Sequence, residues 1–104
     1  GLGDEAAAEQ VYREVQKEFL RLGLAYDAAL VSLDLALLYS RQGRNEDLRQ
    51  LSAEILPVFE ARDVHREALA TLLLFRRAVE EERLTAEVAQ QLIAALRRSR
   101  PARM

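Results

Sequence analysis

The sequence predicts an all-α fold of five antiparallel helices. Turn signals recur about every twenty residues, at Gly23, Gly43, Asp63 and the run 83–85, as expected when each helix crosses the domain once and then reverses. The segments between them carry apolar residues at three- and four-residue steps, which is typical of amphipathic helices. The chain lacks the alternating Val, Ile and Thr pattern of a strand. We therefore expect either helical hairpins or a compact helical bundle.

The first helix is predicted over residues 5–22. Asp4 is placed to be its N-cap, and Gly23 is placed to end it in a left-handed conformation. Apolar residues form one stripe along the segment, and the opposite face is charged. The stripe that we expect to be buried consists of Ala8, Val11, Val15, Phe19 and Leu22.

The second helix, residues 25–42, is apolar nearly all round, because only Ser32 and Asp34 interrupt its middle. A helix of this kind is enclosed on most sides, so we place it at the centre of the domain. Gly43 is the expected C-terminal turn residue, and Asn45 the expected N-cap of the next helix.

The remaining helices are predicted over residues 46–61, 64–83 and 86–99. Pro57 lies inside the third, where it removes one backbone hydrogen bond, so we expect either a kink or a break between two helices. Asp63 and Thr85 are the expected N-caps of the fourth and fifth helices. The fourth carries too many apolar residues for one narrow stripe, which indicates that it is deeply packed or meets a partner.

Composition limits the classes of protein that the chain can belong to. Its 104 residues suit one domain spanning residues 1–104, which we expect to be part of a larger protein, and 50% apolar residues are too many for a disordered chain. The chain has no cysteine, so disulfides and thiolate metal sites are excluded, and a cytoplasmic setting fits. The longest apolar run, residues 68–75, is too short to span a membrane.

Residues of the second and third segments resemble a tetratricopeptide repeat. Leu35, Ala36, Tyr39, Gly43 and Leu48 stand at the offsets where that family has a large residue, a small one, an aromatic, a turn glycine and a further apolar residue. The resemblance implies a protein-binding scaffold, often a regulatory module within a larger bacterial protein. It transfers no catalytic residue.

In the tetratricopeptide arrangement, the concave face of the second helix contacts the partner. The resemblance implies that this face includes Leu33, Leu37, Ser40 and Arg41. Leu33 and Leu37 fit the core equally well, so both assignments stay open.

Residues that would support catalysis or metal binding are sparse, and we predict no enzyme, no metal and no cofactor. His65 is the one histidine, so the two-histidine spacing of a zinc protease is absent. The run 80–82 is three glutamates, but adjacent helical residues point in different directions and cannot converge on one ion. Asp34 is expected at the rim of the core or paired with an arginine, with Arg76 and Arg77 as candidates.

The C-terminal tail is basic while the rest of the chain is acidic. Arginines stand at Arg97, Arg98, Arg100 and Arg103, whereas residues 1–96 hold eleven basic groups against seventeen acidic ones, a net charge of −6. Four arginines suit phosphate binding, but cations are also favoured at a helix C-terminus. Because the acidic body repels nucleic acid, we do not expect nucleic acid as the partner.

The function that the sequence favours is a non-enzymatic protein–protein interaction or scaffold module of tetratricopeptide-like type. Its partner would be another protein or another domain of the same polypeptide. One alternative is a structural domain that forms a homodimer through the apolar excess of the second and fourth helices. A second alternative is a nucleic-acid-binding module that uses the arginine tail.

Overall fold

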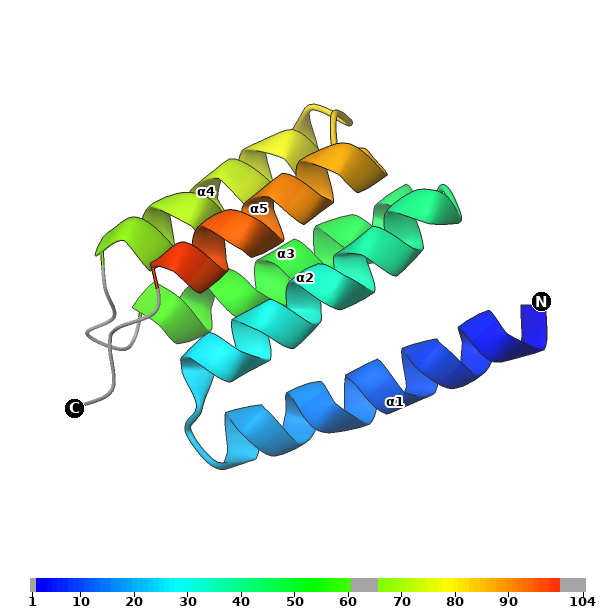
Figure 1. Ribbon diagram of the computed structural model, residues 1–104, viewed down its shortest axis with the longest axis horizontal. Coiled ribbons are helices and arrows are strands. Elements are labelled where there is room, and N and C mark those ends of the chain that lie inside the picture. The colour runs from blue at the N-terminus through cyan, green and yellow to red at the C-terminus, as the bar shows by residue number, and fades with distance from the viewer. Residues whose placement is uncertain (1, 61–65, 100–104) are drawn as a thin grey trace.

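A computed structural model of the chain describes residues 2–60 and 66–99, and it confirms the all-α class. Within those residues there are five helices and no strand. Figure 1 shows the chain reversing its direction from each helix to the next. The helices are α1 (Leu2–Arg21), α2 (Ala25–Arg41), α3 (Asn45–Glu60), α4 (Arg66–Glu80) and α5 (Ala86–Arg98).

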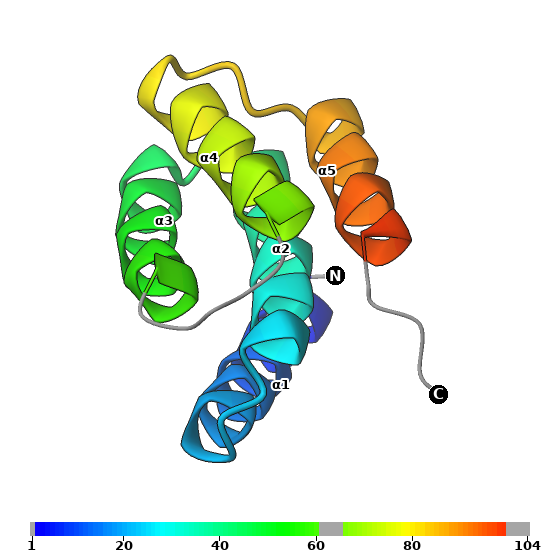
Figure 2. The same cartoon turned by 90° about the vertical axis from the view of Figure 1, so that its left-hand side faces the viewer.

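Helix α2 is central, as its apolar composition predicts. It packs against α1, α3 and α5, and α4 packs against α3 and α5. Helices α2 to α5 therefore form a closed ring, and α1 lies outside it against α2 (Figure 2). This ring is the layout of a compact bundle, one of the two architectures that the sequence left open. The resemblance to tetratricopeptide repeats stays a prediction.

The core lies inside the ring and between α1 and α2. Its largest fully buried side chains include Tyr39, near the C-terminal end of α2, and Phe75 of α4. Each helix of the ring contributes residues at three- and four-residue steps, the spacing that brings side chains onto one helical face. The other large apolar side chains with less than 2% of their surface exposed are Leu33, Leu35, Leu51, Ile55, Leu72 and Leu96.

The ends of α1 and α2 confirm both predicted glycine turns. Gly23 and Gly43 have φ of +76° and +68°, a conformation that costs glycine little because it has no Cβ. At the first turn, the N–H of Gly23 donates to the carbonyl of Leu20 and that of Leu24 to Phe19. The second turn repeats this pattern, the Schellman motif, which satisfies the carbonyls left unpaired at a helix end.

The end of α4 makes the same turn without a glycine. Glu82 has φ of +56°, and its N–H donates to the carbonyl of Val79 while that of Arg83 donates to Ala78. A residue with a Cβ is strained in this conformation. The Glu82 side chain accepts a bond of 2.9 Å from Arg49 on α3, so the strained residue also ties two helices together.

The buried face of α1 differs from the predicted stripe. Val11 and Leu22 are 55% and 54% exposed, whereas Gln16 is only 3% exposed. Phe19 of the predicted stripe packs against the core, together with Tyr12 and Gln16 beside the stripe. The polar glutamine is accommodated there because it finds hydrogen-bond partners. The prediction of Asp4 as N-cap was also wrong, because α1 begins at Leu2.

The predictions for Asn45, Pro57, Thr85 and Asp63 had different outcomes. Helix α3 begins at Asn45 itself and continues through Pro57 as one helix. Pro57 and Ala53, whose carbonyl loses its bond, are both exposed, so the interruption stays on the solvent side. The cap at Thr85 is confirmed, because its Oγ1 accepts from the N–H of Val88 at 3.2 Å. Asp63 lies outside the described residues.

Candidate functional site

A groove runs between α4 and α5 on the outside of the ring. Its volume is about 560 Å³, and its floor and walls are mainly apolar. Leu74 lies in it with 59% of its surface exposed, the highest value among the large apolar residues of the described chain. We call this feature the α4–α5 groove. Its lining residues are Leu74, Arg77, Ala78, Glu81, Arg83, Val88 and Leu92.

The groove exists because α4 has more apolar residues than one inward face can use. Ala68, Leu72, Phe75 and Val79 follow one another at steps of four and three and turn into the core. Leu74 falls between them and points away, next to the equally apolar Leu73, which is 44% exposed. The sequence predicted that α4 is deeply packed or meets a partner. In the structure one face of α4 is packed in the core and another apolar face is exposed.

Charged side chains border the groove at one end. Arg77 and Arg83 have side chains 78% and 77% exposed, and both approach the carboxylate of Glu81, at 3.4 and 3.9 Å. Ion pairs as exposed and as long as these are weak. Two guanidinium groups that share one carboxylate leave the rim with a net positive charge.

A second cleft, of about 270 Å³, lies between the N-terminal half of α1 and the C-terminal half of α2. It contains two of the four residues that the tetratricopeptide resemblance marks for partner binding, Leu37 and Arg41. Of the other two, Leu33 is fully buried in the core, and the Ser40 hydroxyl donates to the carbonyl of Leu84 at 2.9 Å. The structure therefore does not bring the four residues together on one exposed surface.

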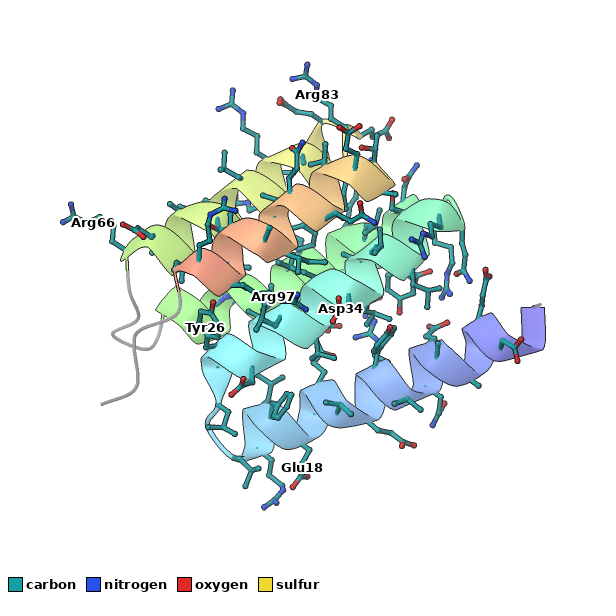
Figure 3. The ribbon with its side chains drawn as sticks, in the orientation of Figure 1. Glu18, Tyr26, Asp34, Arg66, Arg83 and Arg97 are labelled. Atoms are coloured by element: carbon teal, nitrogen blue, oxygen red, sulfur yellow. The ribbon has the colours of Figure 1, made fainter. Side chains whose placement is uncertain are left out.

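Asp34 also lines this cleft, half-buried on α2. Burial raises the pKa of its carboxyl group, and the positive charge of Arg97 on α5 offsets part of this shift. The two residues lie near one another in Figure 3. The expected position at the rim of the core is confirmed, because Asp34 is half-buried. The candidate partners were wrong, because Arg76 bonds Glu80 and Arg77 approaches Glu81.

The other charged candidates lie apart from one another. Glu80, Glu81 and Glu82 each interact with a different helix position, through Arg76, Arg77 and Arg49 respectively. Arg97 and Arg98 are exposed in the last turn of α5. The predicted positions His65, Arg100 and Arg103 lie outside the described residues.

A polar network around Tyr39 was not predicted. The Tyr39 hydroxyl donates to Glu9 at 3.0 Å and accepts from Arg13 at 3.1 Å, and the Arg44 guanidinium lies 4.4 Å from the ring centre. Arg44 also donates to both carboxylate oxygens of Glu9, at 2.7 and 3.2 Å. This contact to Arg44 holds the pKa of Glu9 below its usual value, while burial raises the pKa of Tyr39.

The same network connects α1 to the ring. Arg13 donates to Glu54 on α3 at 3.0 Å and to Gln16 at 3.2 Å. Gln16 in turn donates to the Ser32 hydroxyl of α2 at 2.8 Å. Buried polar groups that are all satisfied fix the position of the elements that carry them. We therefore regard the network as the element that positions α1, not as a site for chemistry.

Two further properties concern the described part of the chain. No helix there combines the length and the apolarity needed to cross a bilayer. Nor do residues 2–60 and 66–99 contain a group of three or more His, Cys, Asp or Glu side chains arranged to hold a metal ion.

Comparison with known proteins gives no assignment. No protein-family model, no curated protein and no solved structure matches the chain.

Proposed function

We propose that this chain is a non-enzymatic protein–protein interaction module that docks an amphipathic helix of its partner in the α4–α5 groove. The observation that carries the proposal is the exposure of Leu74 inside a concave, mainly apolar groove. Apolar surface of this kind gains free energy when a partner covers it. The proposal includes a scaffold or regulatory role in a bacterial cytoplasm, the setting that the tetratricopeptide resemblance and the absence of cysteine favour.

The shape of the groove favours a helix as its occupant. A groove between two helices is the surface on which an amphipathic helix lays apolar residues at positions i, i+4 and i+7. Val88 and Leu92, one turn apart on α5, face Leu74 and Ala78, one turn apart on α4. Successive apolar side chains of a partner helix would fill the space between these two pairs.

The charge of the rim favours acidic residues beside those apolar anchors. Arg77 and Arg83 carry two positive charges, and Glu81 supplies one negative charge. An acidic side chain of the partner would complete the pairing. Contacts at an exposed rim of this kind affect partner selection and the association rate more than the affinity.

A designed peptide tests the proposal. It is a helical peptide of about twenty residues with leucines at i, i+4 and i+7 and glutamates on both sides, carrying a fluorescent label for anisotropy. We expect saturable binding that weakens at least about tenfold, or 1.4 kcal/mol, in Leu74→Glu. A version of the peptide with lysines in place of the glutamates should bind less tightly.

The matched control is Val11→Glu, which alters a residue of nearly equal exposure, 55% against 59%, on a different helix. At a protein concentration at which the unaltered chain is monomeric, it should bind the peptide as the unaltered chain does. Equal binding by Leu74→Glu and Val11→Glu, or no binding to the unaltered chain up to about 500 μM, would refute the proposal.

A further inference from the structure

The outer face of α1 carries an apolar stripe that the fold leaves uncovered. Val11 and Leu22 are 55% and 54% exposed, and Val15 between them is half-buried. Steps of four and seven residues place all three on one side of the helix. These are three of the five residues that the sequence predicts as buried; Phe19, from the same predicted stripe, packs against the core together with Tyr12. An amphipathic face thus exists without a partner inside the molecule.

Acidic residues flank this stripe. Glu14 follows Val11 by three positions and borders the stripe, whereas Glu18, three positions after Val15 and four before Leu22, lies in line with it. Both are exposed: Glu14 accepts a bond of 3.0 Å from Gln10, and Glu18 pairs with Arg21. The outer face of α1 therefore carries apolar residues beside carboxylates, which is the combination that complements the α4–α5 groove.

We infer that the α4–α5 groove of one copy of this chain binds the outer face of α1 of a second copy. The inference rests on the proposed function, because it names the partner of the same groove. Val11, Val15 and Leu22 would contact the apolar lining around Leu74, and Glu14 would lie near the arginines of the rim.

The dimensions agree with this pairing. From Val11 to Leu22 the stripe spans eleven steps of the helix, or about 16 Å at a rise of 1.5 Å per residue. The 15 residues of α4 and the 13 of α5 extend over about 22 and 20 Å by the same rise. The apolar stripe is thus shorter than the walls of the groove, and its acidic neighbours reach the rim.

The two surfaces lie on opposite sides of the molecule. Figure 2 shows α1 at one edge and α4 with α5 at the other, and Figure 3 shows Arg83 and Glu18 on opposite sides. The contact is therefore heterologous, because the groove of one copy meets the α1 face of the other, and the pair leaves one groove and one α1 face free. Heterologous contacts lengthen into open chains unless their rotation closes a ring.

Complementary variants test the inference, with mass measured by sedimentation and light scattering from about 5 to 500 μM, a range that brackets micromolar affinities. The unaltered chain should grow in mass with concentration, beyond a dimer. Val11→Glu blocks one surface and Leu74→Glu the other, so each alone should stay monomeric. An equimolar mixture should give a one-to-one heterodimer and nothing larger, because one intact surface of each kind remains.

A reversal of charges gives the second measurement. Glu14→Arg and Arg83→Glu should each weaken self-association, and the chain with both changes should regain it. All these positions are exposed, so circular dichroism and thermal melting are expected to show folded variants.

The outcomes separate the two proposals. If the unaltered chain stays monomeric to about 500 μM, or if the mixture of Val11→Glu and Leu74→Glu stays monomeric, the inference is overturned. Binding of the designed acidic peptide that still depends on Leu74 would then leave the proposed function standing, with a different protein as partner. If peptide binding is also absent, both the proposed function and the inference are overturned.

Discussion

Replacing Glu82 tests whether the turn after α4 stores backbone strain. Its φ of +56° costs a residue with a Cβ about 1–2 kcal/mol, whereas glycine loses about 0.4–1 kcal/mol through the larger entropy of the unfolded chain. Both Glu82→Gly and Glu82→Ala remove the contact to Arg49, so the free energy lost with that contact is the same in the two variants. The glycine variant should therefore be the more stable of the two by about 1 kcal/mol.

The turn after α2 provides the reverse experiment. A Cβ added to Gly43 would meet nothing within 4 Å, so Gly43→Ala should lose about 1 kcal/mol from the φ of +68° alone. Urea denaturation gives these differences directly, and about 1 kcal/mol corresponds to a shift in melting temperature of about 4–8 °C for a domain of this size. Equal stabilities for Glu82→Gly and Glu82→Ala would refute the argument from strain.

Three further predictions concern titratable and polar groups. Tyr39→Phe removes one donated and one accepted bond and should lose about 1–3 kcal/mol in urea denaturation, and an unchanged midpoint would contradict this. Glu9 has a lowered pKa because Arg44 bonds it. Its contribution to stability is therefore present above the usual glutamate pKa and is lost as pH falls through the lowered pKa. Glu9→Gln should be less stable than the unaltered chain at pH about 7 and should have the same stability near pH 2. Asp34 has a raised pKa because it is desolvated, so its contribution to stability is lost as pH rises through that pKa. Asp34→Asn should therefore stabilise the fold at pH about 7 but not at pH about 3. The opposite order would show that the positive charge of Arg97 outweighs the desolvation of Asp34.

Local features of the fold were predictable because the sequence encodes them locally. The period of apolar residues, the two turn glycines and the Thr85 cap act within a few residues. The buried face of α1 was not predictable in this way. The pattern shows only the positions of the apolar residues along α1. Gln16 turns inward because Ser32, a residue of the next helix, accepts its hydrogen bond.

The candidate groove was predictable only in part. The apolar excess of α4 indicates a surface to be covered, but the exposure of Leu74 depends on where α5 lies, which no local pattern specifies. Asp34 shows the same limit, since the arginine near it comes from α5 and not from α4. The network at Tyr39 joins residues from three helices and a turn, so spacing along the chain carries no sign of it.

The ring of α2 to α5 has a consequence for how the chain folds. All but one of its main helix contacts join helices that are consecutive in sequence, and the contact of α2 with α5 alone spans two intervening helices. Chains dominated by such local contacts fold quickly, whereas closing a long loop costs entropy before its contacts form. The hairpins can thus assemble step by step, and we expect the meeting of α5 with α2 to come late and to complete the core.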